Sequence, residues 1–256
     1  MKVRITHISD THNKHKQLNG KLPGGDLLIH SGDFTSIGRE HEVEGFIKWF
    51  NQQPYKHKVF IAGNHDLTFE SEILLKNKSE WFDKKSYSNL NPANGKPQWL
   101  EVLLNELPDG VTYLENSDIE IDGIKIWGSP FSPSFGYGWA FNADRGYDIN
   151  SIWSKIPTDT DIVITHSPIY GYCDRAQNTG QNVGCADLYH RLHEVKPHLH
   201  FAGHIHEAYG YKQIPYKDKW GDIYTFNGCI CNLRYDAVNA PITFDYDFET
   251  REINFL

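Results

Sequence analysis

Side chains that bind metal ions or transfer protons stand directly after several short apolar runs in this sequence. The clearest example is Gly63-Asn64-His65-Asp66, which follows the apolar, β-branched run at residues 58–62. A run of this length and composition predicts one buried strand, and the glycine lets the chain turn sharply at its end. Taken alone, the four residues could equally form an ordinary turn, because Asn and Asp favour turns. The interpretation therefore depends on whether the pattern recurs.

The pattern does recur, after predicted strands at residues 3–9, 26–31, 160–165 and 200–203. In open α/β sheets such groups meet outside the carboxyl ends of the strands. Carboxylate and amide oxygens mixed with imidazole nitrogens suit Mn, Fe, Zn or Co. The set is too large for one ion, so we expect two ions that share one carboxylate, and Asp33 is the expected bridge. The ligand candidates are Asp10, His12, Asp33, Asn64, His166, His204 and His206.

Bulk composition sets limits on the class of protein. The chain has 256 residues, of which 39% are hydrophobic and 23% charged, enough for one large globular domain. A net charge of -8 argues against a general basic surface for long nucleic acid or an anionic membrane. Neither a signal-peptide core nor a long apolar span is visible, so we expect a cytoplasmic protein. We expect reduced thiols rather than disulfides at Cys173, Cys185, Cys229 and Cys231.

The order of the elements indicates a parallel or mixed sheet covered by helices. Apolar residues at helical spacing predict amphipathic helices, and we expect helices at residues 40–52, 71–78 and 184–195. Two runs around an Asp122-Gly123 hairpin turn are expected to begin a second half-sheet, at residues 111–114 and 119–127. Residues 131–146 predict an aromatic loop. Closing antiparallel strands are expected at residues 223–227, 242–246 and 252–255.

The complete series of motifs resembles the calcineurin-like metallophosphoesterases. All five motifs stand in that family's order: Asp10-x-His12, Gly32-Asp33, Gly63-Asn64-His65-Asp66, His166 and Gly203-His204-x-His206. Longer stretches such as Leu28-Ile-His-Ser-Gly-Asp-Phe-Thr35 and Gly203-His-Ile-His-Glu207 are similar to the MPPED-type branch, the relatives of class III cyclic nucleotide phosphodiesterases. Ser167 stands where that branch more often has Gly, and we expect this difference to matter little. The resemblance implies one domain over residues 1–256, folded as a four-layer α/β/β/α sandwich with two mixed sheets.

The resemblance also implies roles for individual residues. A hydroxide that bridges two divalent ions, with Mn²⁺ favoured, would attack phosphorus. His65 would lie near the leaving group without binding metal, and Asp66 would either orient His65 or hold the local structure. One ion would take Asp10, His12, Asp33 and His206, and the other Asp33, Asn64, His166 and His204.

Several functions fit this expected site. The first is a phosphodiesterase acting on cyclic nucleotides or other small diesters, and the second is a phosphomonoesterase or nuclease on the same two ions. The third is a non-catalytic interaction scaffold, since a fold does not fix a function. A complete ligand set favours catalysis over a scaffold. Substrate contacts are expected from Asn64 and His65, and Trp139 and Asn142 of the aromatic loop could form a nucleoside pocket.

Overall fold

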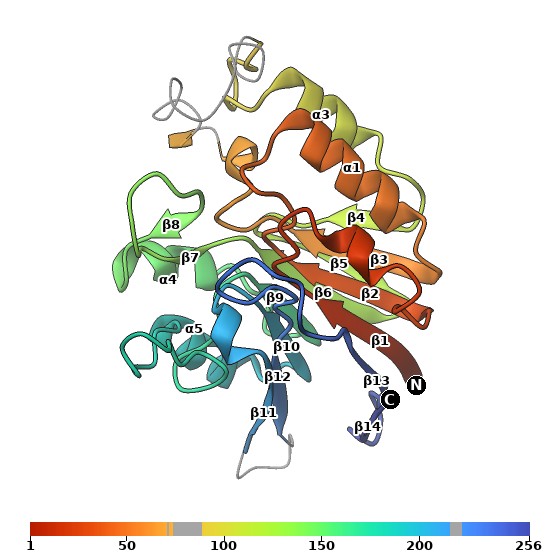
Figure 1. Ribbon diagram of the computed structural model, residues 1–256. Coiled ribbons are helices and arrows are strands. Elements are labelled where there is room, and N and C mark those ends of the chain that lie inside the picture. Colours follow the sequence, from red (N-terminus) through yellow and green to blue (C-terminus); the bar gives the residue numbers. More distant parts are fainter. Residues whose placement is uncertain (71, 74–88, 216–221) are drawn as a thin grey trace.

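The computed structural model of the chain describes residues 1–70, 72–73, 89–215 and 222–256. Two six-stranded sheets dominate it (Figure 1), with strand orders β14-β13-β1-β2-β3-β4 and β11-β12-β10-β9-β6-β5. The first sheet contains β1 (Lys2–Ile8), β2 (Gly25–Ser31), β3 (Tyr55–Ile61), β4 (Val111–Tyr113), β13 (Ile242–Asp247) and β14 (Ile253–Phe255). The second contains β5 (Ser117–Ile121), β6 (Ile124–Ser129), β9 (Ile162–Thr165), β10 (Leu199–Ala202), β11 (Gly210–Ile214) and β12 (Ile223–Asn227).

Both sheets are mixed, with parallel strands at their centres. In the first sheet β1, β2, β3 and β4 run parallel, while β13 and β14 add antiparallel pairs beyond β1. In the second sheet β6, β9, β10 and β12 run parallel, and the edge strands β5 and β11 are antiparallel to their neighbours. Parallel strands have their carboxyl ends at the same end of a sheet, and the loops at this end hold the predicted ligands.

Apolar side chains fill the space between the two sheets. Ile5, Ile29 and Ile61 of the first sheet belong to the same buried cluster as Ile126 and Phe201 of the second. The central strands are buried on both faces, which explains why they appear in the sequence as nearly continuous apolar runs. Burial of this surface is the main force that holds the two sheets face to face.

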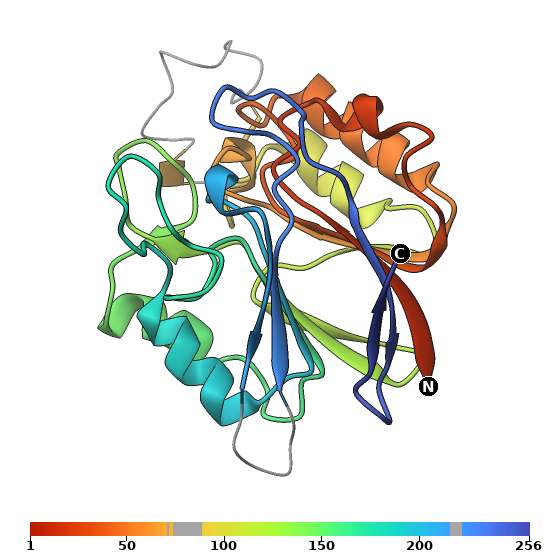
Figure 2. The same cartoon turned by 60° about the horizontal axis from the view of Figure 1, so that its bottom comes forward.

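Helices cover the outer face of each sheet and complete four layers (Figure 2). The helices α1 (Glu40–Asn51) and α3 (Gln98–Asn105) pack on the first sheet through a cluster that includes Phe46, Leu100 and Phe60 of β3. The helices α4 (Tyr147–Trp153) and α5 (Ala186–Val195) pack on the second sheet, where Ile149 and Leu188 join Val163 of β9. The predicted α/β/β/α sandwich is confirmed.

Shorter elements lie in the loops around this framework. Within the described residues, the 3-10 helices η1 (His15–Leu18), η2 (Leu67–Phe69) and η4 (His206–Ala208) follow β1, β3 and β10. The aromatic loop contains one small pair of strands, β7 (Ser132–Pro133) and β8 (Asn142–Ala143). These elements shape the loops at the site end of the sheets.

Several sequence-based expectations about elements were wrong in detail. The run at residues 111–114 does not begin the second sheet, because β4 pairs with β3 in the first. The run at 223–227 pairs parallel to β10 and is antiparallel only to β11, a strand we did not expect. The helices α3 and α4 were also not expected. Of the helix expected at 71–78, all but residues 72–73 lie outside the described residues.

Other expectations hold with small shifts of their ends. The helix expected at 40–52 is α1, which ends one residue earlier, and the helix expected at 184–195 begins at Ala186. All four cysteines carry free thiols, as predicted. Across the described ranges, no helix is both long enough and apolar enough to cross a bilayer.

Candidate metal centre

Loops from both sheets bring the predicted ligands together at the carboxyl ends of the parallel strands. The first sheet supplies Asp10 and His12 after β1, Asp33 after β2 and Asn64 after β3. The second sheet supplies the remaining three, His166 after β9 and His204 and His206 after β10. Residues from 10 to 206 in the sequence therefore meet at one place, where the two sheets face each other.

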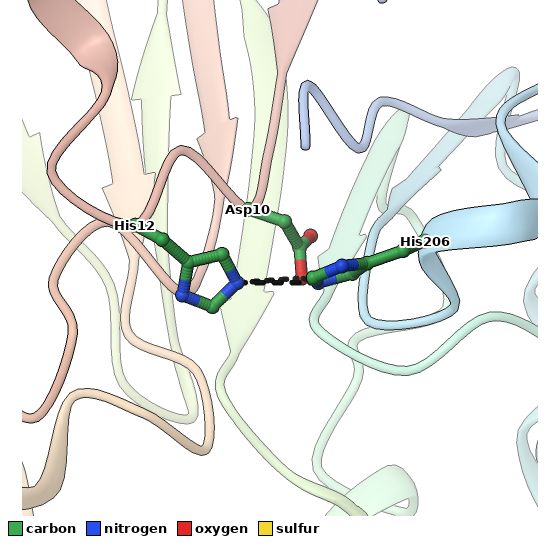
Figure 3. Close-up of side chains that lie close together, drawn as sticks. All are labelled: Asp10, His12 and His206. Atoms are coloured by element: carbon green, nitrogen blue, oxygen red, sulfur yellow. Dashed lines mark hydrogen bonds and ion pairs between the residues drawn. The ribbon is translucent and has the colours of Figure 1, made fainter. Parts of the chain in front are cut away.

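Asp10, His12 and His206 form the first ligand group (Figure 3). His206 Nε2 lies 3.2 Å from Asp10 Oδ1, and His12 Nε2 lies 4.0 Å from the same oxygen. The two Nε2 atoms are 3.2 Å apart. Each residue offers one donor atom toward a common point, and one of them comes from the opposite sheet.

Asp33, His166 and His204 form the second ligand group. Asp33 Oδ2 lies 3.3 Å from His166 Nε2 and 3.9 Å from His12 Nε2, so this carboxylate faces both groups. The amide oxygen of Asn64 lies 2.9 Å from His166 Nε2 and joins the second group. This arrangement places Asp33 where a bridging carboxylate would stand between two ions.

Backbone carbonyls orient three of the ligand histidines. The Nδ1 atoms donate to Thr35 O from His12 at 3.2 Å, to Ser31 O from His166 at 2.9 Å, and to Asn232 O from His206 at 2.9 Å. A carbonyl can only accept, so the ring proton resides on Nδ1 and Nε2 is left to face the site. Hydrogen bonds of this kind select the tautomer and the ring direction of metal ligands.

The donor set fits divalent metal ions. The Nδ1 atoms of His12 and His206 are already hydrogen-bond donors, so the two Nε2 atoms, 3.2 Å apart, can approach this closely only with a proton or a cation between them. Asp10 Oδ1 is buried and has no hydrogen-bond partner, although Oδ2 accepts from Ser9 Oγ at 2.5 Å and from His204 N at 2.9 Å. Buried polar atoms are normally satisfied, and a metal ion would satisfy this one.

Charge interactions keep both carboxylates ionised in spite of their burial. Burial raises the pKa of Asp10, but the nearby His206 ring and the other neighbouring imidazoles have the larger, opposite effect, so the pKa lies well below its usual value. Burial likewise opposes the charge of Asp33, yet the imidazoles of His166 and His65 lower its pKa below the usual range. The site therefore presents two anionic oxygen ligands near neutral pH.

The four ligand histidines divide into two with a lowered pKa and two with a raised pKa. Burial lowers the pKa of His12 to about 4 and that of His204 to about 3, so both rings are neutral and ready to bind metal. Burial also acts on His166 and His206, but the carboxylates of Asp33 and Asp10 outweigh it and raise both pKa values to about 9. A metal that binds these two rings must displace protons from them.

Four ligand residues adopt a backbone conformation that L-residues rarely occupy. Asp10, His12, Asp33 and His204 have φ values of 49°, 39°, 56° and 68°. Each such residue costs about 1–2 kcal/mol relative to ordinary backbone, so the surrounding structure must enforce it. The strained turns aim the side chains inward immediately after the strands end.

Two glycines allow the loops to approach each other closely. A Cβ atom at Gly203 would overlap Ser9 Oγ and the Asp10 carboxylate, and one at Gly63 would overlap the Asp33 carboxylate. No other residue type fits these positions without displacing a ligand. The glycines at these strand ends therefore serve close packing around the carboxylates.

His65 lies beside the ligand groups and is held from several directions. Its backbone N–H donates to Asp33 Oδ1 at 2.7 Å, and its Nδ1 donates to Ser36 O at 2.8 Å. The ring of Trp139 packs against the imidazole with a centroid distance of 4.3 Å. His65 also joins His12 and Asp33 in a third group of potential metal donors.

Asp66 is buried below the site and binds backbone rather than the His65 ring in the contacts of the described residues. Its carboxylate accepts from Gly63 N at 2.8 Å, Asp33 N at 3.0 Å and Thr35 N at 3.0 Å, and from Thr35 Oγ1 at 2.6 Å. Burial and the nearby Asp33 carboxylate raise the pKa of Asp66 to about 8. These contacts hold the loop after β2 against the loop after β3, which is the structural alternative stated above for Asp66.

Asn142 is occupied within the aromatic loop. Its Nδ2 donates to Trp139 O and Ala140 O at 3.0 and 3.1 Å, and its Oδ1 accepts from Phe135 N at 3.2 Å. The exposed ring of Phe135 lies 4.8 Å from the His204 ring. Asn142 thus organises the loop, and Phe135 and Trp139 are the residues by which this loop places aromatic rings against the site.

Sequence reasoning missed Tyr235. Its ring lies 4.7 Å from His12 and 5.6 Å from His206, measured between ring centroids. Tyr235 belongs to the loop between β12 and β13, which has no ligand motif of its own. The carbonyl of Asn232 also contacts His206, and a sequence does not show contacts of this kind.

Comparison with known proteins identifies the family. The profile described as calcineurin-like phosphoesterase matches residues 3–208, which include every predicted ligand. The chain belongs to the calcineurin-like phosphoesterases. Members of this family use divalent metal ions, so the two ligand groups place this phosphoesterase among metal-dependent hydrolases.

Relatives of this phosphoesterase occur in mammals. The chain is 38% identical over 245 residues to metallophosphoesterase domain-containing protein 1 of Homo sapiens and to that of Mus musculus, covering 95% of this chain and 71% of each relative. Among solved structures, TT1561 of Thermus thermophilus is similar with a TM-score of 0.58 and 10% identity, covering 100% of this chain and 99% of that one. The solved structure supports the fold.

Proposed function

We propose that this phosphoesterase hydrolyses phosphodiesters, with cyclic nucleotides or other small diesters as substrates. The observation that supports it best is the position of Asp33, whose Oδ2 faces His12 in one ligand group and His166 in the other. Two ions that share a carboxylate can bind both non-bridging oxygens of a phosphoryl group. The acidic balance of the chain favours a small substrate over long nucleic acid.

The proposed ligand sets follow the two groups. Asp10, His12, Asp33 and His206 would hold one divalent ion, and Asp33, Asn64, His166 and His204 the other. The ions would lower the pKa of a bound water and so provide a nucleophile near neutral pH. We propose Mn²⁺ as the native metal and the cytoplasm as the location.

His65 supplies the proton chemistry in this proposal. The hydrogen bond from Nδ1 to Ser36 O turns Nε2 away from the loop backbone and toward the site. A histidine in that position stabilises charge on the phosphoryl group and protonates the leaving alkoxide. Asp66 contributes by fixing the loop that carries Asn64 and His65, through its hydrogen bond with Gly63 N.

The arginines favour a diester over a monoester. A monoester carries a second negative charge, which a specific site would meet with a free cationic side chain. Arg145 donates to Gly184 O and Val183 O, and Arg175 donates to Gly180 O, while Arg39 contacts Glu42. Loop position makes Arg39, Arg145, Arg175 and Arg234 the candidates for such a contact, and the first three are thus bound to other groups.

Initial rates on two chromogenic esters test the proposal. After metal removal and re-addition of Mn²⁺, we expect metal-dependent cleavage of bis(p-nitrophenyl) phosphate to exceed that of p-nitrophenyl phosphate. A screen of cyclic nucleotides would then define the substrate. Faster cleavage of the monoester would reassign the protein as a phosphatase, and no cleavage of either ester with both metals bound would support a scaffold.

A further inference from the structure

The loop that carries Tyr235 is a tight turn. Asn232 Oδ1 accepts hydrogen bonds from Arg234 N at 2.8 Å and from Asp236 N at 3.0 Å, and Asn232 N donates to Asp236 O at 2.9 Å. Tyr235 itself has a φ of 61°, a conformation that is unfavourable for an aromatic residue unless its surroundings impose it. The turn therefore holds Tyr235 in a defined place although the side chain is exposed.

One carbonyl connects this turn to the candidate metal centre. Asn232 O accepts from His206 Nδ1 at 2.9 Å and also from Tyr235 N at 2.9 Å. The position of the tyrosine is thus coupled to the orientation of a proposed metal ligand. The ring then stands edge-on to His12 and His206, with interplanar angles of 88° and 89°.

The hydroxyl of Tyr235 is directed at His65. Tyr235 Oη lies 3.5 Å from His65 Nε2, and the two ring centroids are 5.8 Å apart. Because His65 Nδ1 donates to Ser36 O, the neutral ring presents the lone pair of Nε2 to this hydroxyl. The hydroxyl donates to this lone pair, and it can accept from Nε2–H when the ring carries the proton for the leaving alkoxide. Ser36 O, the Trp139 ring and Tyr235 surround the imidazole on three sides.

We infer that Tyr235 is a positioning residue for His65, which it holds through its hydroxyl in the direction used for catalysis. This role rests on the proposed phosphoester hydrolysis. The hydroxyl reaches His65 from the opposite side to Ser36 O, so loss of the hydroxyl leaves Nε2 without this donor while the packing of the ring remains. Tyr235 thereby contributes to the proposed reaction from outside the ligand motifs.

Tyr235→Phe separates the hydroxyl from the ring, because the substituted ring can still pack on His12 and His206. With bis(p-nitrophenyl) phosphate and Mn²⁺, we expect kcat to fall by about 5- to 20-fold, with KM and bound metal nearly unchanged. Tyr211→Phe is the matched control, since Tyr211 is also exposed but packs on Phe255 at the edge of the sheets. An unchanged kcat in Tyr235→Phe would overturn the inference.

A double variant shows whether the hydroxyl acts through His65. If it does, adding Tyr235→Phe to His65→Ala produces no further loss of kcat, because the group that it positions is already absent. Equal losses in both backgrounds would mean that Tyr235 acts independently of His65, which contradicts the inference.

NMR tests the contact without relying on activity. In zinc-loaded protein labelled with ¹⁵N, we expect Tyr235→Phe to shift the Nε2 resonance of His65 while Nδ1 stays protonated, and Tyr211→Phe to shift neither. An unchanged Nε2 resonance would overturn the positioning role even in an active enzyme. If the wild-type protein cleaves no ester, the proposed function fails, and the NMR result still decides whether the hydroxyl meets His65.

Discussion

At the scale of single residues, the candidate site is a set of side chains with restricted freedom. Three imidazoles are turned inward by backbone carbonyls, and four ligand residues sit in strained turns. Such preorganisation allows a metal to bind without first ordering its ligands. His65 differs from the ligands because its Nε2 faces Tyr235, so its removal should affect turnover more than metal content.

His65→Ala tests this distinction. We expect kcat on bis(p-nitrophenyl) phosphate to fall by about 100- to 1,000-fold, because a proton donor and a charge-stabilising group are lost together. Metal content, measured by elemental analysis, should stay at the wild-type value. His41→Ala is the control, since His41 is exposed on α1. A parallel loss of metal and activity in His65→Ala would instead make His65 a ligand.

At the scale of elements, buried histidines connect neighbouring strands. His200 of β10 lies with Nε2 2.9 Å from Thr165 Oγ1 of β9 and with Nδ1 2.8 Å from Thr225 Oγ1 of β12. One imidazole thus links three parallel strands beneath the metal-site loops. Burial lowers the pKa of His200 to about 3, so the folded protein keeps this ring neutral.

Stability should therefore depend on pH through His200. Above pH 6.5, the ring is neutral in both the folded and the unfolded chain and contributes no pH dependence. Between pH 6.5 and about 3, only the unfolded chain binds the proton, so the free energy of unfolding falls as the pH falls. This one ring should add a slope of about 1.4 kcal/mol per pH unit well inside that window.

His200→Gln removes this titration. Urea unfolding between pH 4 and 6 should give a shallower dependence of stability on pH than in the wild type, by about that slope, whatever the loss of stability at neutral pH. His41→Gln should keep the wild-type slope. Parallel curves for His200→Gln and the wild type would show that the buried ring does not titrate as its environment implies.

At the scale of the whole molecule, the candidate site joins the two sheets. Asp10, His12, Asp33 and Asn64 come from the first sheet, and the other three ligands come from the second. Between the sheets, apolar side chains form most of the contact. A metal ion bound by residues of both sheets would therefore connect them at the carboxyl ends of their parallel strands. Metal binding should then be linked to the stability of the entire fold.

Metal removal should accordingly lower the melting temperature. At a free Mn²⁺ concentration 100 times the dissociation constant, bound metal stabilises the fold by about 2.7 kcal/mol per site, a shift of several degrees for a chain of this size. We expect a chelator to reverse this increase in the melting temperature of the wild type. In His166→Ala, which lacks a ligand from the second sheet, the shift should shrink. If the melting temperature does not change after verified removal of the metal, a site that spans the two sheets is contradicted.

Patterns within the sequence were enough to predict strands, covering helices and the ligand candidates, and the resemblance to a known family implied the four layers. Strand runs are apolar because both faces are buried, and each ends in a polar group, so local chemistry marks both the element and its end. Asp10, Asp33 and Asn64 were identified in this way, each from within a few residues of its strand. The short strand β4 was assigned to the wrong sheet, because pairing partners depend on long-range packing rather than on local pattern.

Only the tertiary structure decided which of the predicted ligands lie together and what surrounds them. The sharing of Asp33 between two groups, the carbonyl of Asn232 behind His206 and the approach of Tyr235 to His65 all join residues far apart in the sequence. Every residue has a backbone carbonyl, so the sequence does not show which carbonyl will accept a hydrogen bond from a given histidine. The sequence around Tyr235 contains no ligand motif, so it does not indicate that this residue lies beside His65 in the folded chain.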